Sequence, residues 1–249
     1  MKIYNNVIIG SGYAAIGFAK AAVGTLILEE HQICDTQFYL PLTSFTYNHY
    51  EPMYDSGRML YSTFVENGLF LADMQNTNGF ECGLCEYLQK EPVDILLKCR
   101  VISIQETDKY APNACFDVRA QTNEGIVHFI THRVIDARPG SIKRSYTVLY
   151  VTQNPSEDAE ELCAAFPGAY VEPAFYDGRY AIHIPAGNTD ENLVKLEIYR
   201  KWNDIATEAK IVYMAPVFCC DGGAELSDQF YDNPIAAFEA GYRRGKELA

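Results

Sequence analysis

The residues of this chain that are best suited to chemistry form a short glycine-rich segment that could bind a phosphate group. The segment consists of small residues and one tyrosine: Gly10, Ser11, Gly12, Tyr13, Ala14 and Ala15. It matches the pattern G-x-G-x-x-A, in which alanine replaces a third glycine. Gly10 permits a tight turn, Gly12 lets the backbone approach a pyrophosphate, and Ala15 lets a helix pack closely on the preceding strand. Free N–H groups at the start of that helix favour bound phosphates, so the segment predicts a dinucleotide site.

The sequence around this segment supplies the elements that such a site needs. The expected strand, helix and second strand cover residues 7–9, 14–23 and 25–28. Glu29 and Glu30 end the second strand, and we assign both to the cofactor site. Glu29 lies seventeen residues after Gly12, close to the usual spacing of about 20 for an acid that binds the adenosine ribose. A glycine turn in an unrelated α/β protein is the alternative, and the complete order of elements favours nucleotide binding.

Cysteine is another residue type with potential chemistry, and the chain has eight of them. Cys82 and Cys85 form a CxxC pair that could act as a dithiol, although the low specificity of this motif favours a structural role. Cys219 and Cys220 are adjacent in the sequence, and such a pair rarely closes a relaxed disulfide. A tetrahedral zinc site would need a second CxxC pair or paired histidines, so we expect no metal.

Proton transfer would fall to a histidine, because imidazole titrates near neutral pH. His49 and His183 are the candidates, and Cys219 and Cys220 complete a weak set of candidate catalytic residues. Either histidine is more often a polar residue with a structural partner. No Ser/His/Asp order and no paired-carboxylate spacing stands out, so the sequence identifies no catalytic residue.

Composition limits the classes of partner. The 249 residues carry a net charge of −13 and no run of lysine or arginine, which disfavours nucleic acid and anionic membranes as partners. No segment reaches the roughly 18 apolar residues of a membrane span, and the N-terminus lacks the features of a signal peptide. We therefore expect a cytoplasmic protein with reduced cysteines and a small-molecule substrate. The sequence leaves open a homo-oligomer or a partner subunit.

Further along the chain, buried strands alternate with a small antiparallel meander. The expected strands cover residues 93–105, 115–120, 126–130, 133–140 and 210–216. A final helix begins at Asn233 and Pro234. Together with the N-terminal turn, this order resembles the FAD-dependent oxidoreductases of the glutathione-reductase-like superfamily, as a short and partly degenerate member. The segment from Val134 to Gly140 is similar to the V-I-D-A-T-G strand end of that family, with arginine and proline in place of threonine.

The resemblance implies FAD as the cofactor and adds residues to the expected site. Val101 would contact the adenine through its backbone. Ala137 and Gly140 would line the cofactor near its phosphates. Asp221, which Gly222 follows in a turn, would contact the ribityl chain of the flavin.

The chain also departs from the pattern of the family it resembles. No glycine pair follows Glu30, and Cys220 stands where the family has a glycine before Asp221. Cys34 falls near the position of the family's redox pair, but Tyr39 occupies the place of the second cysteine. These departures keep a non-catalytic role open beside an enzymatic one.

The expected fold is α/β: a Rossmann-like FAD/NAD(P)-binding domain with a parallel sheet and an antiparallel meander, plus a small inserted α+β cap or substrate region. The binding domain would comprise residues 1–37, 91–140 and 210–249, and the inserted region residues 38–90 and 141–209. Aromatic residues of the first inserted segment could wall a substrate pocket. Packing in a core is favoured for them, because aromatic side chains bury so much area.

The function expected from this fold is that of an FAD-binding oxidoreductase acting on a small organic substrate through the flavin. The alternative is a non-catalytic protein on a degenerate flavoprotein fold that binds a nucleotide or a partner chain. An NAD-dependent dehydrogenase fits the meander and the final helix less well. The fold by itself does not decide between these functions.

Overall fold

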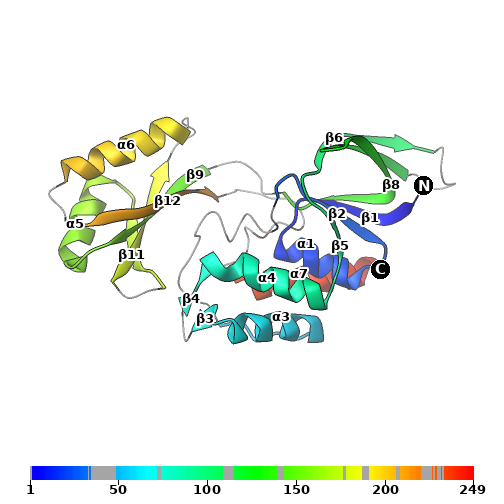
Figure 1. Ribbon diagram of the computed structural model, residues 1–249, viewed down its shortest axis with the longest axis horizontal. Helices are drawn as coiled ribbons and strands as arrows, with labels where there is room; N and C mark the ends of the chain where they lie inside the picture. Colours follow the sequence, from blue (N-terminus) through cyan, green and yellow to red (C-terminus); the bar gives the residue numbers. More distant parts are fainter. Residues whose placement is uncertain are drawn as a thin grey trace.

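The chain is built on two larger β-sheets of different type and a two-stranded hairpin, as the computed structural model shows (Figure 1). The structure describes residues 2–32, 34, 49–71, 74–108, 115–138, 143–175, 178–186, 191–205, 208–219, 226, 228, 231 and 233–249. Within these residues, each helix is too short or too polar to cross a membrane.

The first sheet has six strands in the order β5-β2-β1-β8-β7-β6. Its strands are β1 (Ile3–Ile9), β2 (Thr25–Leu28), β5 (Asp94–Leu96), β6 (Arg100–Thr107), β7 (Cys115–Thr122) and β8 (Gly125–Asp136). Strands β5, β2, β1 and the second half of β8 are parallel, whereas β6, β7 and the first half of β8 form an antiparallel meander. The predicted Rossmann-like sheet with a meander is therefore confirmed.

Two strand predictions differ from the structure in this sheet. The single strand predicted over residues 93–105 is divided, because Lys98 adopts a left-handed backbone conformation with φ of 54°. The chain turns there, so that β5 pairs with β2 and β6 pairs with β7. Conversely, the strands predicted over residues 126–130 and 133–140 are joined in β8 as far as Asp136. The first half of β8 pairs with β7 and the second half with β1.

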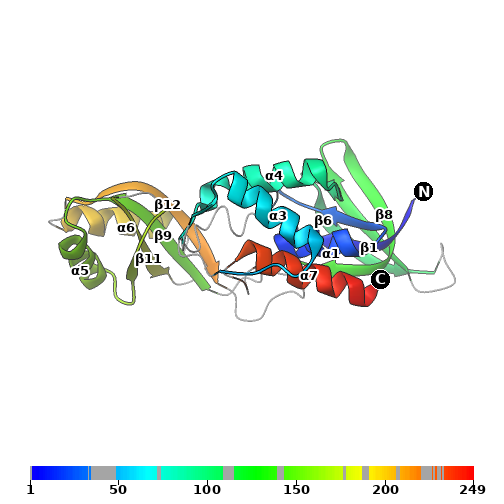
Figure 2. The same ribbon diagram turned by 90° about the horizontal axis from the view of Figure 1, so that it is seen from below.

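The described helices in the lobe of the first sheet are α1 (Tyr13–Ala21), α3 (Asp55–Glu66), α4 (Phe80–Lys90) and α7 (Pro234–Leu248). Helices α1 and α7 lie side by side (Figure 2), and their backbones nearly touch. A Cβ atom added at Gly17 would lie 1.9 Å from the carbonyl oxygen of Phe238, and one added at Gly241 would lie 1.8 Å from that of Ala14. The absence of side chains at Gly17 and Gly241 thus allows the two helices to pack this closely.

Aromatic side chains fill the space between α1, α3 and α4. The rings of Phe64, Phe70 and Phe80 lie 5.2–5.8 Å apart between centroids, and Tyr13 of α1 contacts Phe64 at 6.0 Å. The hairpin of β3 (Phe70–Leu71) and β4 (Met74–Gln75) and a short 3₁₀ turn (Thr77–Gly79) join α3 to α4. These aromatics belong to one hydrophobic core that also contains residues of α1 and α7, which agrees with the predicted core role. Tyr39 and Tyr47, two further aromatics of this segment, lie outside the described residues.

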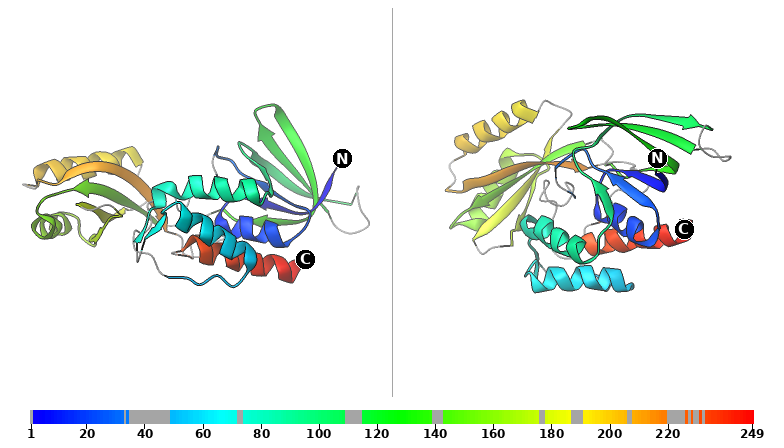
Figure 3. Two further views of the ribbon diagram at one scale, coloured as in Figure 1. Left: turned by 60° about the horizontal axis from the view of Figure 1, so that its bottom comes forward. Right: turned by 45° about the vertical axis from the view of Figure 1, so that its right-hand side comes forward.

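The second sheet is antiparallel, with the order β10-β11-β9-β12. Its elements are β9 (Lys143–Val151), α5 (Pro155–Ala165), β10 (Tyr170–Pro173), β11 (Arg179–Ala186), α6 (Glu191–Asp204) and β12 (Lys210–Cys219). Helices α5 and α6 pack on one face around Trp202, and this lobe stands apart from α1 and α7 (Figure 3). The expected division of the chain groups residues 210–249 with the first domain. In the structure, β12 pairs with β9 of the second sheet.

Candidate dinucleotide-binding site

The glycine-rich turn lies where the carboxyl ends of the parallel strands β1, β2 and β8 meet. Gly10 has φ of +98°, and its N–H donates to the carbonyl oxygen of Leu28 at 2.8 Å. A Cβ atom at Gly10 would lie 3.1 Å from the backbone nitrogen of Arg138, at the end of β8. The left-handed conformation and the close contact both favour glycine, as the sequence pattern predicts. The edge at which this turn lies is the usual ligand-binding edge of an open α/β sheet.

The first turn of α1 holds a carboxylate of the same chain. The N–H groups of Tyr13 and Ala14 donate to Oδ2 and Oδ1 of Asp228, at 2.5 Å and 2.8 Å. Gly12 precedes the helix, and a Cβ atom added there would lie 2.6 Å from Oδ2 of Asp228. The carboxylate therefore occupies the place where the sequence pattern predicts a pyrophosphate. In chemical terms, its two oxygens stand in for phosphate oxygens at a helix N-terminus.

The environment of Asp228 disfavours its charged form. The residue is 1% exposed, and this burial raises the pKa of the Asp228 carboxyl to about 7, although the two backbone N–H donors act in the opposite direction. Sequence reasoning missed Asp228 because 215 and 214 residues separate it from the two groups that it contacts. No local pattern marks the residue, because its contacts join parts of the chain that are far apart in sequence.

Glu29 closes the other side of the turn. Its Oε2 accepts hydrogen bonds from the backbone N–H and the hydroxyl of Ser11, both at 2.7 Å. Its Oε1 lies 2.8 Å from the backbone nitrogen of His31 and 2.7 Å from Nδ1 of the same residue. The side chain is buried and ties the end of β2 to the glycine-rich turn. A ribose hydroxyl could reach the carboxylate only by replacing one of these donors, and ribose binding by Glu29 stays a prediction.

The other residues predicted at this site lie around the same edge or in its neighbouring strands. Glu30 is exposed and its Oε1 lies 3.5 Å from Nε of Arg100, at the start of β6. Val101 is half-buried in β6 and pairs with Ala120 of β7. Ala137 is buried, and its N–H donates to the carbonyl oxygen of Ile9 at 2.8 Å, which fixes the end of β8 beside the turn.

Three predicted cofactor residues, Gly140, Asp221 and Gly222, lie outside the described residues, as does the candidate Cys220. The backbone of Cys219 lies at the end of β12. His49 is exposed and precedes α3.

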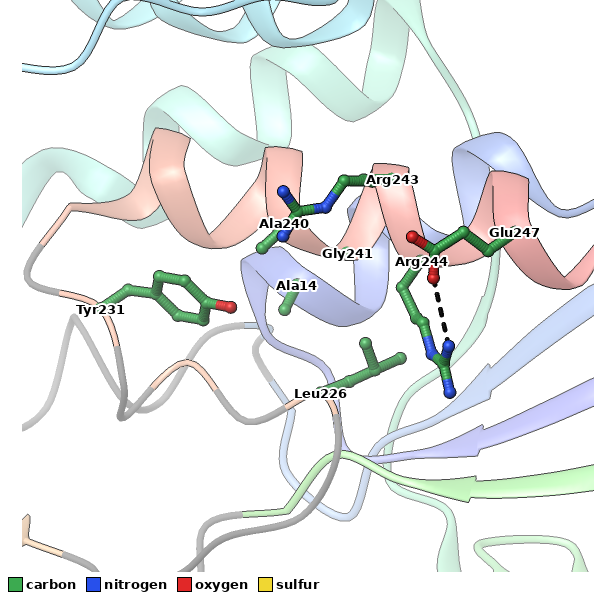
Figure 4. Close-up of a pocket in the computed structure, with 8 residues that line it drawn as sticks. All are labelled: Ala14, Leu226, Tyr231, Ala240, Gly241, Arg243, Arg244 and Glu247. Atoms are coloured by element: carbon green, nitrogen blue, oxygen red, sulfur yellow. Dashed lines mark hydrogen bonds and ion pairs between the residues drawn. The ribbon is translucent and has the colours of Figure 1, made fainter.

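The N–H groups of Tyr13 and Ala14 at the start of α1 form a cradle for an anion. A pocket of about 340 Å³ adjoins this cradle on the side of α7 (Figure 4). Its lining consists of Ala14, Leu226, Tyr231, Ala240, Gly241, Arg243, Arg244 and Glu247. Arg244 donates to Glu247 at 3.1 Å. Burial and the Asp228 carboxylate raise the pKa of the Tyr231 phenol, whereas Arg243 lowers it. The Tyr231 phenol therefore lies within electrostatic reach of both Asp228 and Arg243.

The candidate His183 lies in the second lobe, within a chain of hydrogen bonds. Its Nδ1 lies 3.0 Å from Oγ1 of Thr147, and its Nε2 lies 2.9 Å from Oε1 of Glu172. Tyr170 stacks on the imidazole, with ring centroids 4.5 Å apart and planes 19° apart. Thr147 and His183 are buried on the face of the sheet opposite to α5 and α6. This arrangement can orient an imidazole and hold a proton on either nitrogen.

The thiols of the CxxC pair, Cys82 and Cys85, are exposed on α4, and partial burial together with Glu81 raises the pKa of the Cys85 thiol. A raised pKa lowers the fraction of reactive thiolate. The described part of the chain contains no group of three or more residues able to hold a metal ion.

No model of a protein family matches the chain, and no curated protein matches it. Several solved structures do match the chain. The chain is similar to p-nitrophenol 4-monooxygenase PnpA from Pseudomonas putida DLL-E4, at 13% identity and a TM-score of 0.52, over 100% of this chain and 79% of that one. It is also similar to aklavinone-11 hydroxylase, whose structure contains FAD and aklavinone, at 12% identity and a TM-score of 0.54, over 100% of this chain and 63% of that one.

A third similar structure is a geranylgeranyl bacteriochlorophyll reductase-like protein from Thermoplasma acidophilum, at 11% identity and a TM-score of 0.58, over 100% of this chain and 78% of that one. The chain thus spans less than two thirds of the aklavinone hydroxylase and nearly four fifths of the other two. The chain shares its fold with these solved proteins, one of which contains FAD, and this likeness confirms the predicted fold. The glutathione-reductase-like comparison describes this fold only approximately.

Proposed function

We propose that this protein binds FAD and acts as an oxidoreductase on a small organic substrate. One observation carries the proposal: at the start of α1, two backbone N–H groups converge on an anion above Gly12. Such a cradle binds a pyrophosphate in Rossmann-like domains, and the absence of a side chain at Gly12 leaves room for it. The likeness to flavoproteins, one of them solved with FAD, supports this cofactor over other dinucleotides.

The chain offers groups for each part of the cofactor. Tyr13 and Ala14 would donate to the pyrophosphate, and Glu29 would accept from the ribose once one of its present donors gives way. The backbone of Val101 would meet the adenine. Ala137 and Gly140 would line the phosphates, and Asp221 with Gly222 would contact the ribityl chain; these assignments remain proposals.

Bound FAD would supply the electron transfer, so the protein's own groups need only position the substrate and move protons. His183 is the best-supported candidate for proton transfer. With its proton on Nε2, the imidazole donates to Glu172, and Nδ1 is left to accept from the hydroxyl of Thr147. A carboxylate that fixes the tautomer in this way prepares the opposite nitrogen to act as a base. His49, Cys219 and Cys220 remain weaker candidates.

The alternative function is a protein of the same fold that binds no flavin. In that case Asp228 would fill the cradle permanently as a structural cap of α1. Both possibilities can be separated by a direct measurement of cofactor content.

The test is to purify the full chain without added cofactor, record its visible absorption spectrum and identify any released ligand by mass. We expect a flavin spectrum and release of FAD on denaturation. Gly12→Val should weaken FAD binding by at least about 100-fold, because a side chain there excludes an anion that accepts two charge-assisted hydrogen bonds. The control is Gly68→Asn, at an open left-handed position that asparagine tolerates. A folded, colourless protein that takes up no added FAD would refute the proposal.

A further inference from the structure

We propose that Asp228 is an internal ligand of the pyrophosphate cradle, and that a dinucleotide must displace this carboxylate in order to bind. The inference rests on the proposed function, because it concerns the same cradle. It adds that access to the site is governed by a residue of the chain itself.

The first step is that the cradle holds one anion at a time. The N–H groups of Tyr13 and Ala14 at the start of α1 both donate to Asp228, and the N–H of Ile16 donates to the carbonyl oxygen of Gly12 at 2.9 Å. A Cβ atom at Gly12 would already lie within 2.9 Å of all three carboxyl atoms of Asp228. A phosphate group in hydrogen-bonding contact with Tyr13 and Ala14 would overlap this carboxyl group.

The second step is that burial in the cradle disfavours the charged form of Asp228. Asp228 is 1% exposed, and burial raises the pKa of its carboxyl to about 7. Near neutral pH the group is therefore partly protonated, and the neutral carboxyl is a weaker acceptor for the two N–H groups than a carboxylate. A pyrophosphate, in contrast, stays anionic and accepts from both donors. The cradle is thus better matched to the dinucleotide than to its present occupant.

The third step is that a destination for the displaced carboxylate lies next to the cradle. Ala14, whose N–H belongs to the cradle, also lines the pocket of about 340 Å³. Tyr231 and Arg243 line the same pocket (Figure 4). Among the described residues, the Tyr231 phenol lies within electrostatic reach of Asp228, and Arg243 acts on the same phenol. Arg243 is therefore the expected partner of a displaced Asp228.

Displacement fixes the sign of a pH dependence. A carboxylate in solvent or beside Arg243 has its ordinary pKa of 3.8 or a lower one, whereas in the cradle its pKa is about 7. Binding then releases a proton, and the affinity for the dinucleotide rises with pH up to about 7 and is level above it. If Asp228 stayed beside a bound pyrophosphate, the new negative charge would raise its pKa further. Binding would then take up a proton, and affinity would fall as pH rises above 7.

The experiment is a calorimetric titration of the apo-protein with FAD, and separately with ADP, at four pH values from about 5.5 to 8.5 and in two buffers of different ionisation enthalpy. The wild-type chain should bind both ligands roughly 20-fold more weakly at pH 5.5 than at pH 7.5, with release of a proton. Asp228→Ala should bind about tenfold more tightly or better, since the internal competitor is gone. Both Asp228→Ala and Asp228→Asn should lose the pH dependence.

Glu239→Gln is the matched control, because Glu239 is another buried carboxylate that meets a helix start but lies outside the cradle. This variant should keep the wild-type pH dependence. A pH dependence that survives both Asp228 substitutions would come from another group and would overturn the inference. Proton uptake, or equal affinity in all variants at every pH, would overturn it as well.

The two ligands separate this inference from the proposed function. If ADP binds with the expected coupling to Asp228 while FAD does not bind, the internal ligand stands and the flavin function fails. If FAD binds equally to wild type and Asp228→Ala, the function stands and the internal ligand fails. Binding of neither ligand to any variant would overturn both.

Discussion

Two helices of the first lobe begin against a buried carboxylate from α7 or the segment that precedes it. At α1, Asp228 accepts from Tyr13 and Ala14; at α3, Glu239 accepts from the N–H groups of Met53 and Tyr54, at 2.9 Å and 2.7 Å. Both carboxylates are 1% exposed. Both lie against a glycine, and a Cβ atom at Gly57 of α3 would be 2.3 Å from Oε1 of Glu239.

The two carboxylates differ in how firmly they are held. Glu239 belongs to α7 and has a third donor, the hydroxyl of Tyr50, at 3.1 Å. Burial and this carboxylate raise the pKa of Tyr50 to about 12, so the phenol remains a donor at every physiological pH. Asp228 has two backbone donors and a pKa of about 7. The same motif therefore acts as a structural cap at α3 and as a displaceable ligand at α1.

The sequence before each helix marks this difference. A buried parallel strand and a G-x-G turn lead into α1, and this geometry aims the free N–H groups at the edge of the sheet. The residues before α3 have no such turn, and Gly57 lies inside the helix. A carboxylate at a helix start therefore acts as a structural cap where the start binds nothing else. It acts as a competitor where the start also binds the phosphates of a ligand.

The largest expected difference between the two sites is in stability. Glu239→Ala should lower the free energy of unfolding by about 3–5 kcal/mol, because it removes a buried charged acceptor from the part-buried donors of Tyr50, Met53 and Tyr54. The measurement is urea denaturation followed by circular dichroism at pH 7.5. A loss below about 1 kcal/mol would show that this carboxylate is no firmer a cap than Asp228.

A smaller effect on stability, which depends on pH, is expected at Asp228. The folded-state pKa of Asp228 lies above its unfolded value of 3.8, so the folded state binds more protons between these values. The contribution of Asp228 to stability therefore falls as pH rises from about 4 to about 7, by roughly 2–4 kcal/mol, and is level above pH 7. Asp228→Asn should remove this slope.

The check on that slope is the difference in unfolding free energy between wild type and Asp228→Asn, measured by urea denaturation at pH 4.5, 6 and 7.5. The difference should change steadily in favour of the variant as pH rises. The same series for Glu239→Gln provides the comparison. A constant difference for Asp228→Asn would mean that the two carboxylates are equivalent caps.

The smallest expected effect concerns the pocket beside the cradle. Arg243→Gln should weaken FAD binding at pH 7.5 by about two- to fivefold, since a partly exposed ion pair contributes roughly 0.5–1 kcal/mol. The stability of the variant without ligand should be unchanged. Arg244→Gln serves as the control, because Arg244 already pairs with Glu247 in the same pocket. Equal effects of both substitutions would remove Arg243 as the partner of a displaced Asp228.

Local patterns were sufficient to predict the first strand, turn, helix and second strand, because each depends on neighbours in sequence. Gly10 was identified for the reason that the structure gives, a left-handed φ. The group above Gly12 is the Asp228 carboxyl, and the approach of a pyrophosphate there stays a prediction. The meander and the final helix with Pro234 at its first turn were also predicted. The division at Lys98 was missed, because a left-handed lysine leaves no signal in the apolar pattern.

What sequence reasoning could not supply was the occupant of the cradle. Asp228 is one of 33 acidic residues, and its partners are more than 200 positions away. Sequence reasoning also could not supply the hydrogen bonds around His183. Thr147, Glu172 and His183 come from three strands that meet only in the sheet. Pairings between distant segments, and not local propensity, decide which polar groups become functional.

The contact between α1 and α7 has a consequence for synthesis of the chain. The close fit of Gly17 and Gly241 against the opposite backbone requires two segments that are 224 positions apart. At translation rates of about 5–20 residues per second, the surface of α1 that α7 covers stays bare on the ribosome for roughly 10–45 seconds. That apolar surface is available to holding chaperones during this interval, and the first helix cannot complete its packing until the last one has emerged.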